Sequence, residues 1–272
     1  MPSVLRALAL SFTLAACSGT PSPPPAETPA PAPAERSAKP PALADGAAAI
    51  EAAVRAPDRS EADRALDAGR KPAELLSFFR VAPGQKVAEL FAGGGYTAEL
   101  LARVVGPSGQ VYGQNTKAML ELFAAKPWAA RLAKPELANV ARADRELDSP
   151  LPPEARGLDA VLFLFSYHDS VWMGTDRAAM NRAVFEALKP GGVYGVVDHS
   201  AKAGRGVEDV KTVHRIEKDV LVKEVLAAGF KLDAEAGFLA NPADPRDWDA
   251  SPRAAGDRRG TSDRFVLRFV KP

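Results

Sequence analysis

The segment VAELFAGGGYTAELLA, residues 87–102, decides how the rest of the chain is interpreted. Its first five residues are apolar apart from Glu89, a composition that favours a buried strand. Three consecutive glycines, Gly93 to Gly95, are followed by apolar residues at helical spacing. In doubly wound α/β folds, a glycine-rich turn after a strand lets the backbone approach a ligand. The segment therefore predicts a ligand site at the carboxyl end of a strand.

Strands and helices alternate along most of the chain. Apolar runs predict strands at 87–91, 110–113, 139–142, 158–165, 193–198, 230–236 and 264–270. Helical spacing predicts helices within 45–79 and at 97–105, 117–126, 176–188 and 213–228. Because the last two strands are joined by a long loop without a helical pattern, we expect the last strand to be antiparallel. The expected fold is an α/β, Rossmann-like, doubly wound seven-stranded sheet, mostly parallel with an antiparallel last strand.

The first 44 residues differ in composition from the rest. Residues 1–16 contain Arg6 and then an apolar run, which predicts a signal peptide. The sequence Leu-Ala-Ala-Cys ending at Cys17 resembles a bacterial lipobox, which implies lipidation of Cys17; the alternative is an ordinary signal peptide with an incidental cysteine. Residues 17–44 are rich in proline and alanine and predict an extended spacer. We expect an exported domain over residues 45–272, lipid-anchored to a bacterial membrane and facing the periplasm.

The charge and cysteine content narrow the possible partners. The 35 basic and 34 acidic residues give a net charge of +1, which does not indicate a nucleic-acid surface. Cys17 is the only cysteine, so neither a disulfide nor a thiolate metal site can form within the chain. The composition does not indicate the oligomeric state.

Several motifs resemble one enzyme family. Residues 89–95 resemble the pattern D/E-x-G-x-G-x-G of class I methyltransferases that use S-adenosylmethionine, and the LKPGG turn at 188–192 is also typical of them. More narrowly, GGGYTAELLA, SYHD, LKPGGVYGVVDH and HRIE together resemble a group of exported, predicted methyltransferases. The resemblance covers roughly residues 70–272. It implies S-adenosylmethionine as cofactor and methyl transfer to a small-molecule acceptor.

Two positions depart from the family pattern. Phe91 stands where the motif usually has its first glycine, and Asn115 ends the second strand where an acid usually binds the ribose hydroxyls. The spacing Gly93-x-Gly95-x-x-Ala98 also fits a dinucleotide fingerprint, so a nicotinamide-dependent oxidoreductase is a less favoured alternative. A further alternative is a non-catalytic cofactor-binding or structural module of the same fold, since an exported enzyme needs a supply of a cofactor made in the cytoplasm.

The resemblance also implies cofactor-binding residues. Asn115 is expected to meet the ribose, and Asp144, after the third strand, matches a position that often contacts the adenine amino group. Tyr96 either caps the cofactor or packs against the protein. The methionine and ribose end is expected to be lined by Glu89, Ala92, Gly93 and Gly95.

The candidate catalytic residues follow the fourth and fifth strands, whose ends flank the methyl group in this family. They are His168 and the pair Asp198 and His199, and they hold two of the three histidines in the chain. An oxygen or nitrogen acceptor requires a base, a role that histidine performs most often. The third histidine, His214, is expected to open a helix, either as part of the site or in a salt-bridge cluster.

A metal site is a further hypothesis. Asp169, Asp198 and His199 resemble the ligand positions of metal-dependent catechol-type O-methyltransferases, and such a donor set suits a divalent ion. In the favoured alternative, Asp169 caps a turn and Asp198 orients His199. No metal is therefore assigned from the sequence.

Overall fold

The computed structural model describes residues 43–272. The predicted signal peptide, the lipidation site Cys17 and nearly all of the predicted spacer lie outside the described residues, and these assignments stay predictions. Within the described part, no helix has the length and apolar composition needed to cross a membrane.

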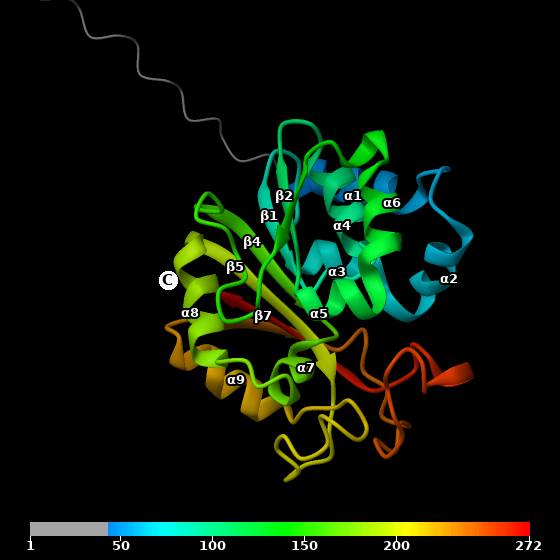
Figure 1. Cartoon of the computed structure of the whole chain (residues 1–272), viewed down its shortest axis with the longest axis vertical. Helices are drawn as coiled ribbons and strands as arrows, with labels where there is room; N and C mark the ends of the chain where they lie inside the picture. Colours follow the sequence, from blue (N-terminus) through cyan, green and yellow to red (C-terminus); the bar gives the residue numbers. More distant parts are fainter. Residues whose placement is uncertain (1–42) are drawn as a thin grey trace, which may run out of the picture. The chain divides into compact units, whose positions relative to one another are not determined.

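Seven strands form a single sheet in the order β3-β2-β1-β4-β5-β7-β6 (Figure 1). β7 is antiparallel to both of its neighbours, β5 and β6, and the other pairs are parallel. The predicted doubly wound sheet with an antiparallel last strand is therefore confirmed. The strands are β1 (Lys86–Leu90), β2 (Gln110–Asn115), β3 (Val140–Asp144), β4 (Leu158–Leu164), β5 (Leu188–His199), β6 (Lys231–Ala236) and β7 (Arg264–Val270).

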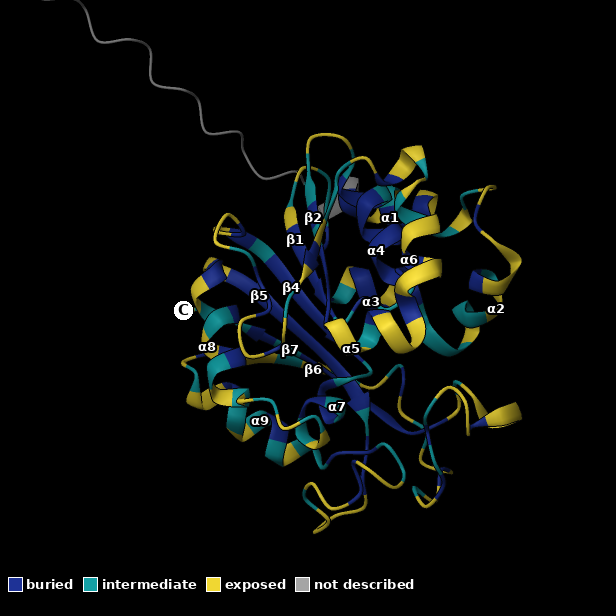
Figure 2. Ribbon diagram, viewed as in Figure 1, coloured by how far each residue is buried: buried dark blue, intermediate teal, exposed yellow. Residues whose placement is uncertain are grey.

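Helices cover both faces of the sheet, and the central strands are mostly buried (Figure 2). This arrangement follows from apolar side chains on both sides of the strands. In β1, Val87 packs with α1, α3 and α4, whereas Ala88 packs on the opposite face with α8 and α9. The helices are α1 (Leu43–Arg55), α2 (Glu61–Arg70), α3 (Pro72–Phe78), α4 (Tyr96–Val105), α5 (Lys117–Met119), α6 (Ala125–Leu132), α7 (Tyr167–Trp172), α8 (Arg177–Ala187) and α9 (Lys218–Ala227). A π-helical segment, η1 (Leu120–Ala124), joins α5 to α6, and 3-10 turns lie at Pro135–Leu137 and Gly256–Arg258.

One helix begins five residues later than the sequence predicts. The expected helix at 213–228 starts only at Lys218. His214 adopts φ 54°, which a right-handed helix excludes. The side chain of Arg215 is fully buried and donates to Asp244 Oδ2 over 2.8 Å and to the carbonyl of Trp248 over 3.2 Å. Contacts with the long loop before β7 therefore override the local helical pattern.

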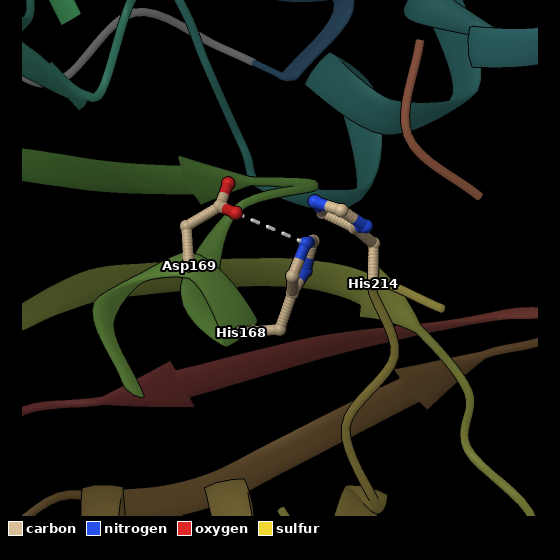
Figure 3. Close-up of side chains that lie close together, drawn as sticks. All are labelled: His168, Asp169 and His214. Atoms are coloured by element: carbon tan, nitrogen blue, oxygen red, sulfur yellow. Dashed lines mark ion pairs between the residues drawn. The ribbon is translucent and has the colours of Figure 1, made fainter. Parts of the chain in front are cut away.

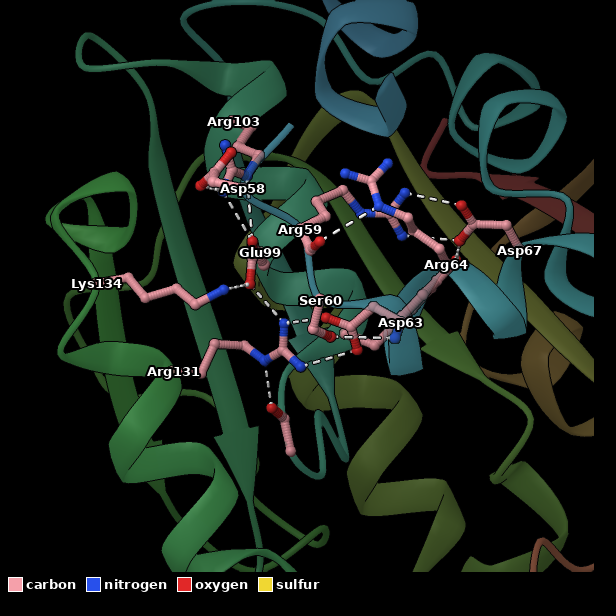
Figure 4. Close-up of polar contacts among 12 residues, drawn as sticks. Asp58, Arg59, Ser60, Asp63, Arg64, Asp67, Glu99, Arg103, Arg131 and Lys134 are labelled. Atoms are coloured by element: carbon pink, nitrogen blue, oxygen red, sulfur yellow. Dashed lines mark hydrogen bonds and ion pairs between the residues drawn. The ribbon is translucent and has the colours of Figure 1, made fainter. Parts of the chain in front are cut away.

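A charged network fixes α2 against α4 and α6 (Figure 4). Arg131 of α6 donates to Asp63 of α2 over 2.8 Å and to the carbonyl of Gly94 over 2.6 Å. Arg59 forms two hydrogen bonds to Asp67, of 2.8 and 2.7 Å. The network therefore connects α2 to the glycine turn and places the end of this helix beside it.

Candidate active site at the carboxyl edge of the sheet

The glycine turn has a left-handed backbone at every second residue. Phe91, Gly93 and Gly95 have φ values of 58°, 57° and 83°. Glycine adopts this conformation without strain, whereas a bulky side chain such as that of Phe91 does so rarely. A Cβ atom on Gly95 would lie 2.4 Å from the ring of Trp128, so packing requires this glycine. A Cβ on Gly93 would meet no atom within 4 Å, so the backbone of Gly93 faces open space.

Two buried amides at the end of β2 hold this turn. Asn115 accepts a hydrogen bond from the Gly93 N–H over 2.8 Å and donates one to the Gly93 carbonyl over 3.1 Å. Gln114 accepts from the Phe91 N–H over 2.8 Å. Asn115 therefore positions the turn from the place where the family usually has a ribose-binding acid. Its predicted contact with a ribose stays a prediction.

Glu89 has an unused hydrogen-bonding atom. The residue is only 4% exposed, and its Oε2 atom has no hydrogen-bond partner among residues 43–272. Burial raises the pKa of Glu89 to about 7, although the Thr97 hydroxyl and the charge of Arg70 favour the ionised form. An unpartnered buried carboxylate oxygen is costly, and a cationic or N–H group of a ligand would satisfy it. Ala92, at the same turn, is buried and donates its N–H to the Gln114 carbonyl.

The side chains of Tyr96 and Asp144 have partners within the protein. The Tyr96 hydroxyl donates to Asp67 over 2.6 Å, and burial raises the pKa of this phenol. Asp144 is exposed and pairs with Arg142 over 2.6 Å. Of the two interpretations of Tyr96, packing agrees with these contacts. The adenine contact of Asp144 stays a prediction.

Arg70 and Phe165 connect the glycine turn to the histidines. The Arg70 guanidinium lies 4.8 Å from the centroid of the Tyr96 ring and 5.0 Å from that of Phe165. The Phe165 ring lies 6.0 Å from the ring of His199, and Arg264 contacts it at 5.9 Å. The cavity enclosed by Arg70, Tyr96 and Phe165 is about 10 Å³, room for one water molecule at most.

His168 is held between two carboxylates. It is 2% exposed, and its Nδ1 lies 2.7 Å from Asp198 Oδ1, while its Nε2 lies 3.3 Å from Asp169 Oδ1. Its backbone N–H donates to Asp198 Oδ2 over 2.7 Å. Burial opposes a charge on this ring, but Asp198 and Asp169 raise the pKa of His168 to about 10. In the absence of another cation beside them, these two carboxylates favour the imidazolium form of His168, which is not a base.

His199 is the neutral counterpart of His168. Its Nδ1 lies 2.7 Å from the Ser262 hydroxyl oxygen, and its backbone N–H donates to Asp198. Burial, with the positive charges of His168 and Arg264, holds the pKa of His199 well below 6.5. The same environment lowers the pKa of Arg264 to about 10, chiefly through burial and the nearby Arg70. A neutral imidazole among cations suits an anionic oxygen ligand better than a cationic one.

All three histidines of the chain lie together, including His214, which the sequence placed on a helix. The ring of His168 is 5.8 Å from that of His199 and 5.5 Å from that of His214. His168, Asp169 and His214 each offer a ligand atom within 4.8 Å of the others (Figure 3). The structure thus brings together the predicted His168, Asp198 and His199. Of the hypothetical metal ligands Asp169, Asp198 and His199, only Asp169 belongs to the converging trio, in which His168 and His214 take the other two places.

Sequence reasoning missed Arg70, Phe165, Ser262 and Arg264. A signal for the last two was available, because an antiparallel last strand places its first residues beside the end of the fifth strand. His199 indeed pairs with Arg264 in the register of β5 and β7. No comparable signal pointed to Arg70 or Phe165.

Comparison with solved structures identifies the fold. A methyltransferase from Aquifex aeolicus described as SAM-dependent matches with a TM-score of 0.52 and 15% identity, over 81% of this chain and 98% of that one. The S-adenosylmethionine-dependent methyltransferase from Mesorhizobium loti matches with a TM-score of 0.51 and 17% identity, over 76% of this chain and 100% of that one. The protein has the class I methyltransferase fold. No family model matches the chain.

The same fold also carries other chemistry. The [4+2]-cyclase SpnF matches with a TM-score of 0.52 and 19% identity, over 80% of this chain and 85% of that one. At such identities the class I methyltransferase fold is what these proteins share, and function must be argued from the site.

Proposed function

We propose that this protein transfers a methyl group from S-adenosylmethionine to a small-molecule acceptor. The proposal rests on two neighbouring features, the open backbone of Gly93 in the glycine turn and the buried Oε2 of Glu89 near the end of β1. This oxygen has no hydrogen-bond partner among the described residues. Both lie at the carboxyl edge of a doubly wound sheet, where such folds bind ligands.

The residues at the glycine turn fit the methionine end of this cofactor. Glu89 would accept a hydrogen bond from its ammonium group, and the backbone of Ala92, Gly93 and Gly95 would lie against it. Bound S-adenosylmethionine supplies a methyl group on a sulfonium, which needs little further activation. The main task of the protein is therefore to hold the acceptor in line.

The histidine cluster is proposed to bind and deprotonate the acceptor. His199 is the base in this proposal, because its ring is neutral and its Nδ1 is oriented by Ser262. Asp198 orients His168 and His199 together through three hydrogen bonds. The low basicity of His199 and the positive charges of Arg70 and Arg264 favour an acidic acceptor hydroxyl, whose anion they would stabilise.

We also propose that the protein is exported and lipid-anchored through Cys17 to a bacterial membrane, with its domain facing the periplasm. The support is the signal-like apolar run, the lipobox-like sequence and the proline-rich spacer. The near-neutral net charge supports a small molecule, and not a nucleic acid, as the acceptor.

Calorimetric titration of the full chain with S-adenosylmethionine, S-adenosylhomocysteine and NAD tests the cofactor assignment. We expect the first two to bind with micromolar affinity and NAD not to bind. Gly93→Arg should abolish binding, since its side chain would fill the open space. Gly157→Arg is the matched control, because Gly157 has φ 65°, equally open surroundings and a position just before β4. NAD binding alone would favour an oxidoreductase.

The main rival is a module that binds the cofactor without turnover. The two hypotheses differ in one measurement, the formation of S-adenosylhomocysteine during incubation with a panel of phenols, catechols and carboxylic acids. Turnover that His199→Gln abolishes supports the enzyme, whereas cofactor binding without turnover of any acceptor class supports the module.

A further inference from the structure

His168, Asp169 and His214 combine the side chains of a transition-metal site. Two imidazoles and one carboxylate suit zinc, cobalt, manganese or iron, whereas magnesium prefers oxygen ligands alone. One potential ligand atom of each residue lies within 4.8 Å of the others. Ligands of a tetrahedral ion are roughly 3.4 Å apart, and His168 Nε2 already lies 3.3 Å from Asp169 Oδ1. His214 then has to move closer by no more than about 1.4 Å, the difference between 4.8 and 3.4 Å.

Each of the three residues has a polar partner behind it. Asp198 binds Nδ1 of His168 at 2.7 Å, which leaves Nε2 of that ring directed at Asp169. Asp249 Oδ1 lies 2.9 Å from Nδ1 of His214 in an ion pair whose geometry is not that of a hydrogen bond, so the ring has to rotate to reproduce the arrangement at His168. Trp172 donates its indole N–H to Asp169 over 2.9 Å. Carboxylates behind the distal ring nitrogen are the usual supports of metal-bound histidines.

The trio of His168, Asp169 and His214 is firmly held by the protein on one side and accessible to solvent on the other. The side chains of His168, Asp169 and His214 are 3%, 16% and 26% exposed, so the group opens to solvent on the His214 side. The segment carrying His214 is tied to the long loop before β7 by the hydrogen bond from the Ala250 N–H to the Val213 carbonyl. An ion could therefore enter without disturbing the buried His168.

We propose that His168, Asp169 and His214 bind a divalent transition-metal ion, with zinc or cobalt preferred over magnesium. Three protein ligands leave at least one coordination position open. If the proposed methyl transfer is correct, an acceptor oxygen would occupy that position beside His199, and the ion would lower the pKa of its hydroxyl. The binding site itself does not depend on that reaction.

The alternative is a permanent ion pair, in which the His168 imidazolium itself neutralises Asp198 and Asp169. Titration with Co²⁺, followed by visible absorption, separates the two. The experiment uses the full chain with Cys17→Ser, because the lone thiol could also bind the ion. We expect the d–d bands of a bound cobalt ion with one-to-one stoichiometry, displacement by Zn²⁺, and no displacement by equimolar Mg²⁺.

Three variants test the assignment of the ligands. His214→Ala should remove the cobalt bands. Because this side chain is partly exposed, we expect the variant to fold, which circular dichroism checks. Asp249→Asn should weaken cobalt affinity by roughly 10- to 100-fold, the usual effect of losing such a support. Asp247→Asn is its matched control in the same loop, since Asp247 is exposed and forms only a 3.9 Å pair with Lys202.

Absence of cobalt bands and of Zn²⁺ binding heat in the parent chain would overturn the proposal. Unchanged cobalt affinity in His214→Ala would overturn it equally. Because these measurements need no S-adenosylmethionine, their failure is distinguishable from failure of the cofactor assignment.

Discussion

The glycine turn and the histidine cluster lie at the same edge of the sheet but are built in different ways. The turn is a contiguous stretch, and Gln114 and Asn115, which hold it, come from the neighbouring strand. The histidine cluster combines residues from α7, β5 and two loops, which span the chain from His168 to Ser262. The first region can therefore be recognised as a motif, whereas the second exists only in the folded chain.

The polar groups of the two regions also differ in how they are satisfied. At the turn, Asn115 makes two hydrogen bonds to Gly93, whereas Glu89 at the end of β1 keeps a buried oxygen without a partner in the described part of the chain. In the cluster, Asp198 accepts three hydrogen bonds and holds His168 as a cation. We infer that the turn is prepared for one ligand and the cluster for another, and that the two regions can be disabled separately.

The largest expected effect is that of Asp198→Asn. The amide NH₂ would face one of the N–H groups from which the carboxylate now accepts a hydrogen bond. The buried ion pair with His168 would also be broken. We expect the free energy of unfolding to fall by about 3 kcal/mol or more, measured by urea denaturation. Asp144→Asn, at an exposed acid, should change it by less than about 1 kcal/mol. Tenfold weaker cofactor binding by folded Asp198→Asn would contradict the separation of the two regions.

Glu89→Gln should act on the turn alone. Because the pKa of Glu89 is raised from 4.5 to about 7, the folded protein binds this proton more tightly than the unfolded chain does. Stability from this group is fully present below pH 4.5 and is lost as the pH rises through 7. At 1.36 kcal/mol per pH unit, the loss is at most about 3 kcal/mol.

The variant should therefore be more stable than the parent at pH 8 and should lose the decline between pH 4.5 and 7. Thermal unfolding across this range provides the measurement. Cofactor affinity should fall roughly tenfold with the loss of one charged hydrogen bond. The opposite result would be a parent protein that becomes more stable, compared with Glu89→Gln, as the pH rises. It would show that the buried acid is ionised at low pH.

Tyr96→Phe should have the smallest effect. It removes the hydrogen bond to Asp67 and should cost about 1–2 kcal/mol in unfolding free energy. Because the ring is retained between Arg59 and Arg70, cofactor affinity should stay within about threefold of the parent value. A much larger loss of affinity in calorimetry would restore the interpretation in which Tyr96 caps the cofactor.

The sequence predicted the framework of the fold because its strands carry long apolar runs and its helices end at Pro–Gly or Gly signals. The antiparallel β7 followed from the long loop that precedes it, and the positions of His168 after the fourth strand and of His199 at the end of the fifth followed from the topology. Local pattern failed at His214, where burial of Arg215 against Asp244 outweighs helical spacing.

Other features of the site depend on tertiary contacts that no local pattern encodes. Asn115 resembles a substituted ribose-binding residue in the sequence, but its amide closes a ring with Gly93 that is visible only in the folded turn. Asp249 follows His214 by 35 positions within an irregular loop, so no periodicity connects the two. Arg70 reaches the site because a network of ion pairs places α2 beside the turn.

A crystal structure of the full chain with S-adenosylhomocysteine tests the central claim most directly. The account predicts ligand density against the backbone of Gly93, with the amino group of the ligand within hydrogen-bond distance of Glu89 Oε2. It also predicts that Asn115 keeps its two hydrogen bonds to Gly93. Ligand bound at another edge of the sheet, or a Glu89 oxygen still without a partner in the complex, would contradict it.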